Sequence, residues 1–158
     1  MRTKKAKKRQ IKPDEKYQSI LVARLINRSM RNGKKSVAQK QIYKALEECA
    51  KLKKMKPVQL LEEVVEKIKP IMEVRSRRVG GASYQVPMSV KTDRAISLAV
   101  RWLVIESNKR PNKQYHTYAD KLIAEMTDAL SNQGGAVGKK ISSHKMAESN
   151  KAFSHFRW

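Results

Sequence analysis

The chain lacks a second cysteine and any long apolar run, and each absence excludes a class of protein. Among its 158 residues, Cys49 has no partner thiol, so an internal disulfide framework is excluded. It falls at an apolar position of a predicted helix, where we expect a buried structural thiol rather than a nucleophile. No apolar run approaches the roughly 20 residues of a membrane-spanning helix, and no N-terminal stretch resembles a secretory signal. We therefore expect one domain with a modest core and no membrane partner.

Acidic residues are also scarce. The chain has 36 Lys+Arg against 14 Asp+Glu, a formal net charge of +22. A surface so far from neutral repels itself unless a negative partner covers it, and nucleic acid is the commonest such partner. An anionic membrane or an acidic protein would also suit the charge. The basic residues are spread along the chain rather than gathered on one amphipathic helix, which disfavours a membrane surface.

Patterns typical of catalysis or metal binding are missing. None of the three histidines has Cys or His neighbours at metal-ligand spacing. Acidic residues mostly sit beside Lys or Arg, as in Glu66-Lys67, which is typical of a solvated helix face. The turn at 32–36 fails as a phosphate loop, because position 28 is not glycine and no Ser or Thr directly follows Lys34. We expect no enzyme, no metal, no cofactor and no small-molecule substrate.

The first 12 residues form a basic segment with almost no large apolar side chains. Its cations include Arg2, Lys4, Lys5, Lys7, Lys8 and Arg9. Such a segment cannot bury itself, so we expect a disordered RNA-binding arm at 1–12 and a single folded domain at 13–158. A targeting peptide is the rival interpretation, but the amphipathic, serine-rich pattern of such peptides is absent.

The rest of the chain is predicted to be mainly α. Apolar residues at helical spacing predict helices at about 16–31, 36–53, 57–69, 92–109, 116–131 and 139–152. Pro57 suits a first helical turn, and Thr92 looks like an N-cap. Gly134, Gly135 and Gly138 are interpreted as a break before the last helix. Because the connections are short, we expect a compact bundle of about six helices.

Residues 73–90 are the exception and predict a β-hairpin between the third and fourth helices. The second limb alternates, with Tyr84, Val86, Met88 and Val90 on one face. Gly80 and Gly81 allow the positive φ angles that a tight turn demands. We expect this hairpin to protrude from the bundle.

The first limb of the hairpin carries Arg75, Arg77 and Arg78. Arg75 and Arg77 are expected to share a face opposite Val74, so that an apolar side packs while a cationic side meets an anion. A purely structural ribbon is the plain alternative.

Further basic residues recur in loops and at helix ends, where they are candidates for phosphate contacts that set affinity and register. They are Lys34 and Lys35 before the second helix, Arg94 and Arg101 on the fourth, Lys109, Arg110 and Lys113 in the following loop, and Lys139 and Lys140 at the last helix. The tail 155–158 places two aromatic rings beside Arg157. It can stack on bases or fold back onto the bundle, and the sequence leaves both open.

Four strings of this sequence resemble the family of small-subunit ribosomal protein seven, in its bacterial or organellar form. They are LVARLINRSMRNGKKS (21–36), EVRSRRVGGASYQVP (73–87), RWLV (101–104) and HKMAESNKAFSHFRW (144–158). They occur in family order and at family spacing over nearly the whole chain. The stretch 138–143 departs from the charged run usual in the family.

The resemblance implies a structural constituent of the small ribosomal subunit, in a bacterial cytoplasmic or organellar ribosome. It implies primary binding to the 3′ major domain of the small-subunit rRNA and nucleation of head assembly. It also implies a place near the exit-site tRNA and the mRNA exit channel, beside head and platform proteins including protein eleven.

Carried onto this chain, the implied rRNA contacts are the arm, Lys34, Lys35, the hairpin arginines, Arg94, Arg101 and the 109–113 loop. The implied tRNA- or mRNA-proximal residues are Gly80, Gly81, Lys139, Lys140, His144, Arg157 and Trp158.

Two other functions stay open at the level of sequence. A helix-turn-helix DNA-binding protein is supported by the charge and by the short turn at 32–36 between two helices. A translational repressor that binds mRNA could coexist with a ribosomal role.

Overall fold

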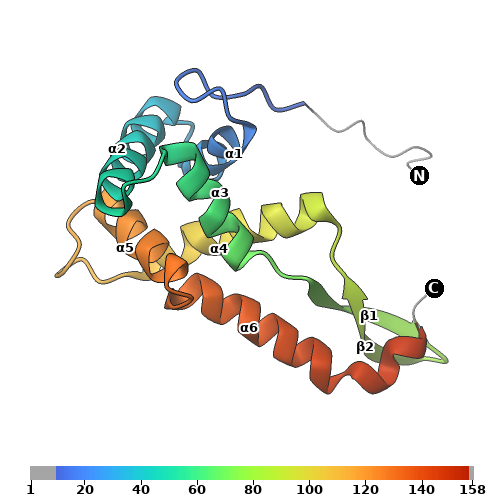
Figure 1. The fold of residues 1–158 in the computed structure, drawn as a ribbon. Coiled ribbons are helices and arrows are strands. Elements are labelled where there is room, and N and C mark those ends of the chain that lie inside the picture. The colour runs from blue at the N-terminus through green and yellow to red at the C-terminus, as the bar shows by residue number, and fades with distance from the viewer. Residues whose placement is uncertain (1–9, 157–158) are drawn as a thin grey trace.

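The computed structural model describes residues 10–156, so the predictions for Arg2, Lys4, Lys5, Lys7, Lys8, Arg9, Arg157 and Trp158 lie outside the described residues. The elements follow in the order α1 (Ile20–Ser29), α2 (Lys35–Lys53), α3 (Pro57–Ile68), β1 (Met72–Val79), β2 (Ala82–Ser89), α4 (Thr92–Lys109), α5 (Tyr118–Leu130), α6 (Gly134–Ser149) and a 3-10 helix η1 (Lys151–Phe156). Helices α1 to α5 form a bundle, and α6 runs from it along the hairpin (Figure 1). The mainly α prediction, with one hairpin between the third and fourth helices, is confirmed.

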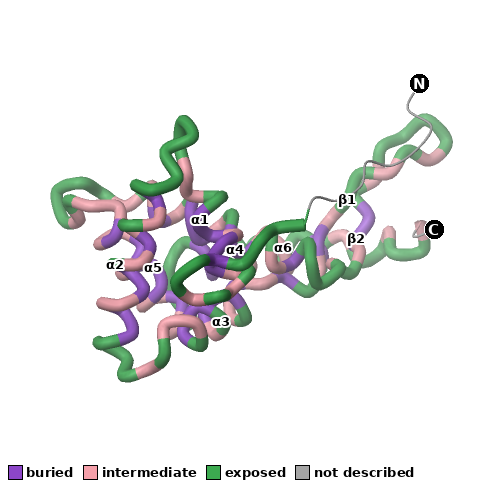
Figure 2. Tube along the Cα trace, turned by 90° about the horizontal axis from the view of Figure 1, so that it is seen from above, coloured by how far each residue is buried: buried purple, intermediate pink, exposed green. Residues whose placement is uncertain are grey.

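The core lies in the bundle, and every one of its helices contributes to it. Leu25 of α1, Ile42 of α2, Leu61 of α3, Leu103 of α4 and Leu122 of α5 are all fully buried in one cluster. Each such side chain stabilises the fold by about 1.5–3 kcal/mol through burial. Figure 2 shows the buried positions concentrated in this body, while the hairpin projects away from it with exposed and intermediate residues and few buried ones.

Cys49 lies in this core, as expected of a structural thiol. Burial raises the pKa of the thiol, although its contact with the Thr127 hydroxyl, 3.9 Å away, opposes that shift. A thiol held neutral in this way is a poor nucleophile.

The first helix begins at Ile20, not at the predicted residue 16. Gln18 adopts a positive φ of 48°, which interrupts any helix there. The Asp14 carboxylate stabilises the turn before α1. It accepts hydrogen bonds from the backbone N–H of Tyr17 at 3.2 Å and from the hydroxyl of Tyr43 at 2.7 Å. The two tyrosine rings meet edge to face at 5.5 Å. This local alternative to helical hydrogen bonding is typical of aspartate.

The last helix begins at Gly134, so the predicted start at 139 is wrong. The glycines there permit close approach rather than breaking the helix. Glu125 Oε1 accepts the backbone N–H of Ala136 at 2.8 Å, and a Cβ on Gly134 would lie 3.0 Å from that oxygen. A Cβ on Gly135 would lie 2.8 Å from Glu106 Oε2. Carboxylates at a helix N-terminus are stabilised by its dipole, and only glycine leaves room for these two.

Helix α4 spans the predicted residues, but its N-cap is Lys91, and Thr92 is already helical rather than the cap. Helix α5 starts at Tyr118, after a capping box in which Thr117 and Asp120 exchange side-chain and backbone hydrogen bonds of 3.2 and 3.0 Å.

The hairpin turn has the predicted chemistry. Gly80 and Gly81 have φ angles of 58° and 87°, the two positive values that a two-residue turn of this hand needs. Nothing lies within 4 Å of a Cβ placed on either glycine, so the tip is open.

Arg75 and Arg77 share a face opposite Val74 as predicted, but the expectation that this face is cationic and the other apolar is wrong. The antiparallel register pairs Arg75 with Val86 and Arg77 with Tyr84. Directly opposed residues project to the same side of a sheet, so both arginines share their face with the apolar residues of β2. Val74 pairs with Pro87 on the other face. A sequence without the register cannot show which faces of two strands coincide.

Candidate nucleic-acid interface

The root of the hairpin is held by one buried carboxylate between two arginines. Glu73 is 7% exposed and accepts the Nε of Arg75 at 2.8 Å. Its oxygens also accept the Nε of Arg94 from α4, at 2.8 and 2.7 Å. Burial raises the pKa of Glu73, but the hydrogen bonds from Arg94 and then Arg75 outweigh it and hold the pKa below its usual range. The carboxylate therefore stays ionised and fixes the direction of the hairpin.

Both arginines remain accessible while they are held. The Arg75 and Arg94 side chains are 50% and 51% exposed. Arg94 uses only its Nε in these bonds, which leaves its terminal N–H groups for a partner. A guanidinium fixed at one edge loses less entropy when it binds a phosphate at the other.

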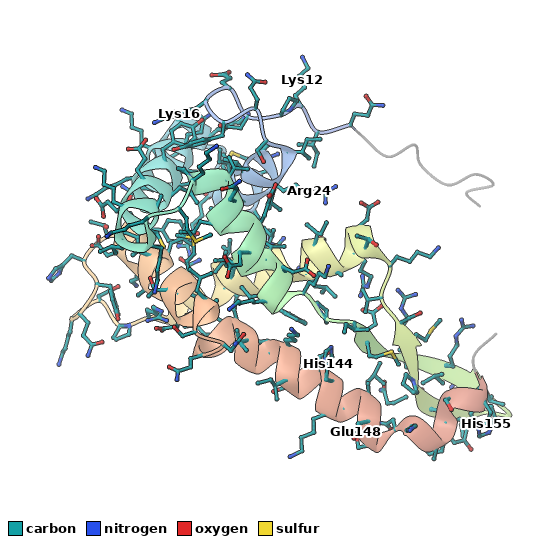
Figure 3. All side chains as sticks on the ribbon, viewed as in Figure 1. Lys12, Lys16, Arg24, His144, Glu148 and His155 are labelled. Atoms are coloured by element: carbon teal, nitrogen blue, oxygen red, sulfur yellow. The ribbon has the colours of Figure 1, made fainter. Side chains whose placement is uncertain are left out.

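A groove between α1 and α4 adjoins this root. Its walls include Arg24 and Arg28 of α1 and Asp93 and Ser97 of α4, around a cavity of about 510 Å³. A second cavity, also about 510 Å³, shares Asp93 and Ser97 and continues to Lys91 and Arg94. Arg24, labelled in Figure 3, lies 3.7 Å from the Asp93 carboxylate. The groove is thus lined by four cations and one acidic residue.

Sequence reasoning did not single out Arg24, Arg28 and Lys91. Arg24 and Arg28 are four residues apart and share one face of α1. The helical spacing of seven grouped Arg94 and Arg101 on α4, and the helical spacing of four could have found this pair too. Arg101 is exposed, seven residues after Arg94.

The turn between α1 and α2 presents three exposed cations, Arg31, Lys34 and Lys35. Asn32 and Gly33 adopt positive φ angles of 50° and 72°, which let the chain reverse within a few residues.

The loop between α4 and α5 contains one cation that serves the fold. Arg110 donates to Glu125 Oε2 from its Nε at 2.9 Å and from a terminal nitrogen at 2.7 Å, and it also pairs with Asp128. Burial lowers the pKa of Arg110, but hydrogen bonds to Asp128 and Glu125 raise it above its ordinary value. The two carboxylates thus already neutralise Arg110, which serves the fold rather than the interface. Lys109 pairs with Glu106 at 2.7 Å but is 58% exposed, and Lys113 is exposed.

Helix α6 holds the start of β1 through polar contacts. The His144 ring Nε2 accepts the backbone N–H of Ile71 at 3.0 Å, and the Ser143 hydroxyl donates to the Met72 carbonyl at 3.3 Å. Figure 3 shows His144 on the length of α6 that runs beside the hairpin. His144 is thus placed as a structural acceptor.

One of the two lysines in the second turn of α6 also has a structural partner. Lys140 donates to the Lys67 carbonyl at 2.7 Å, whereas Lys139 is exposed. Of the pair, Lys139 is the freer to meet a charged partner.

The described part of the tail folds back on the hairpin. The Tyr84 ring of β2 lies 5.3 Å from Phe153 and 5.1 Å from Phe156, measured between ring centroids. Of the two alternatives for the aromatic tail, Phe156 therefore follows the packed one. Its contact adds to the attachment of the hairpin by α6.

Sites of other kinds are not found between residues 10 and 156. No group of three or more His, Cys, Asp or Glu side chains there could hold a metal ion. No helix in that range is long and apolar enough to cross a membrane.

Fold and surface together define a class: a small helical domain with a clamped, projecting β-hairpin beside a cationic groove. The family model described as ribosomal protein S7p/S5e matches residues 1–151, and the chain belongs to this family.

Relatives from several bacteria agree with this assignment. Small ribosomal subunit protein uS7B of Aquifex aeolicus is 54% identical over 95% of this chain and 94% of its own length. Protein uS7 of Nitratidesulfovibrio vulgaris is 50% identical over 96% of this chain and 95% of its own. Protein uS7 of Citrifermentans bemidjiense is 50% identical over 99% of both chains.

Proposed function

We propose that this chain is a structural constituent of the small ribosomal subunit and binds its rRNA directly. The observation that carries this proposal is the cationic groove between α1 and α4, which continues to Arg94 at the hairpin root. Membership of the ribosomal family supports the nature of the partner, and the bacterial relatives favour the bacterial form of the ribosome.

The proposed mechanism is electrostatic. Groove cations, the hairpin arginines, the α1–α2 turn and the N-terminal arm neutralise phosphates and release their counterions. These contacts carry no sequence information themselves. Specificity arises because the helical body holds groove and hairpin at a fixed separation that matches one folded RNA junction, where shape dominates recognition.

At a finer level, we propose that binding is an early step that nucleates assembly of the subunit head on the 3′ major domain. In that setting the open Gly80–Gly81 tip and α6, with its exposed Lys139, face the exit-site tRNA and the mRNA. Neighbouring head and platform proteins, protein eleven among them, cover part of the rest.

A competition experiment tests the proposed partner against duplex DNA. A labelled fragment of the 3′ major domain is bound by the full chain and displaced with unlabelled fragment or with duplex DNA of equal length. We expect the rRNA fragment to compete at least tenfold better, because the fixed separation of groove and hairpin matches only the folded RNA. Equal competition would favour a general DNA-binding protein and refute the proposal.

A further inference from the structure

A small cavity with a mixed polar and apolar lining lies where the α1–α2 turn meets the α4 end and the α5 start. Its polar lining is Ser29, Arg31, Lys34, Gln41, Asn108 and Tyr118. It measures about 230 Å³, below the roughly 300–1,000 Å³ of a pocket for a drug-sized ligand. It is separate from the groove between α1 and α4, with which it shares no residue.

The lining of this pocket carries positive charge from Arg31 and Lys34. Arg31 donates one terminal nitrogen to Asn108 Oδ1 at 3.1 Å, and the rest of its guanidinium stays available. Lys34 is exposed. No carboxylate lines the cavity, so an anionic group is favoured beside these two cations.

Neutral donors complete the polar lining. The Gln41 carbonyl oxygen accepts the backbone N–H of Ala119 at 3.3 Å, which leaves its amide nitrogen to donate to a further acceptor. The hydroxyls of Ser29 and Tyr118 share one hydrogen bond of 2.8 Å. Whichever hydroxyl donates in that bond, the proton of the other is left for a ligand.

The remaining lining is apolar. Val37 and Ala38 on the first turns of α2 line the cavity, and Val37 is 53% exposed at its edge. A bare phosphate would leave this apolar surface and the Gln41 amide unused. A flat ring with acceptor atoms on its edge, joined to a phosphate, would use every part.

We propose that this pocket receives one unpaired nucleotide of RNA. The base lies over Val37 with its edge at Gln41 and the hydroxyl pair, and a flanking phosphate meets Arg31 and Lys34. RNA is read at unstacked bases in this manner, and base contacts of this kind give a protein selectivity that phosphate contacts lack. That the nucleotide belongs to rRNA rests on the proposed function. That the pocket binds a nucleotide rests on its lining residues alone.

Two matched variants test the pocket. Val37→Glu places a carboxylate at its edge, and Leu52→Glu places the same charge at the far end of the same helix, on a side chain that is 69% exposed. Both positions are exposed, so neither change disturbs the core. Uridine or adenosine monophosphate is titrated into the full chain while the Gln41 side-chain amide is followed by NMR, with inorganic phosphate as the comparison.

We expect the mononucleotide to shift the Gln41 amide more than phosphate does, in the unaltered chain and in Leu52→Glu but not in Val37→Glu. We also expect Val37→Glu to bind the rRNA fragment about tenfold more weakly than Leu52→Glu, a typical effect of losing one base contact. Equal shifts from phosphate would reduce the pocket to a simple anion site and overturn the proposal.

The remaining outcomes distinguish a failure of the pocket proposal from a failure of the proposed function. A nucleotide-dependent shift with equal rRNA affinity for the two variants would overturn RNA as the source. No nucleotide-dependent shift, together with equal rRNA affinity, would overturn the pocket altogether. Failure of the unaltered chain to bind rRNA would instead overturn the proposed function, and the mononucleotide titration would still decide what the pocket binds.

Discussion

Some cations of this chain are exposed and others serve the fold, and two cations adjacent in sequence can have these different roles. Lys109 and Arg110 are adjacent, but Lys109 is 58% exposed beside Glu106, whereas Arg110 is 16% exposed between Glu125 and Asp128. Sequence alone assigned both to RNA. The difference depends on carboxylates of α5, 15 and 18 residues further along the chain, which no local pattern indicates.

Replacement of Arg110 should destabilise the fold far more than replacement of its neighbour. Arg110→Ala leaves Glu125, whose side chain is 2% exposed, without its main partner. Removing one member of a buried pair costs about 3–5 kcal/mol, so we expect a loss of about 3 kcal/mol in the free energy of unfolding. Chemical denaturation measures it. Lys109→Ala is the control and should cost under about 1 kcal/mol, as exposed pairs do; similar losses for both would contradict the assigned role.

His144 gives the attachment of the hairpin a pH dependence. Burial, followed by the charge of Lys140, lowers the pKa of His144 below its ordinary 6.5, and the neutral ring is the form that accepts the Ile71 N–H. A depressed pKa means that this stabilisation is fully present above pH 6.5 and is lost as the pH falls through the lowered value.

The Ile71 amide signal should therefore shift together with the His144 ring signals in an NMR titration from pH 7.5 to 5. In His144→Ala the Ile71 amide should show no transition in this range. If the chemical shift of the Ile71 amide did not change as His144 becomes protonated, the hydrogen bond would not hold the hairpin.

At the scale of elements, periodicity predicted which segments are helices, and close contacts between elements decided where they begin. Helix α4 ends at Lys109 as expected, because Pro111 follows closely and disfavours helical geometry at the residue before it. Helix α6 departs most, because glycine is ordinarily unfavourable in a helix by about 1 kcal/mol and here leaves room for Glu106 and Glu125. The register of the hairpin likewise places apolar residues of β2 on the same face as Arg75 and Arg77. Both errors arise from contacts that a single strand or helix does not encode.

Two glycines of α6 should respond oppositely to the same change. Gly135→Ala would place a Cβ 2.8 Å from Glu106 Oε2 and 3.0 Å from the Glu106 Cβ, so it should lower the unfolding free energy despite the better helix propensity. Gly138→Ala meets nothing within 4 Å and should raise it by about 0.5–1 kcal/mol. Thermal and chemical unfolding compare them. Stabilisation by both substitutions would show that α6 does not need close approach at its start.

At the scale of the molecule, the body fixes a cationic groove and a cationic ribbon in one arrangement. Three sets of contacts hold the hairpin in place. They are the hydrogen bonds between Glu73 and Arg94, the hydrogen bond from Ile71 to His144 of α6, and the packing of Tyr84 against Phe156. Composition was sufficient to predict a polyanionic partner. It could not distinguish Arg24 in the groove from Arg110 in the α4–α5 ion pairs, because that depends on which helices pack together.

The salt dependence of rRNA binding tests the central claim most directly. The logarithm of the association constant for the rRNA fragment is measured against the logarithm of salt concentration for the full chain and for two double variants. Arg24→Ala with Arg28→Ala removes two groove cations, and Lys51→Ala with Lys53→Ala removes two from the last turn of α2.

We predict a steep negative slope for the unaltered chain, because each phosphate contact contributes about one unit. The groove variant should lose about two units of that slope, and the α2 variant should keep it. A nearly flat slope, or the same slope for all three chains, would contradict electrostatic binding of RNA through this groove.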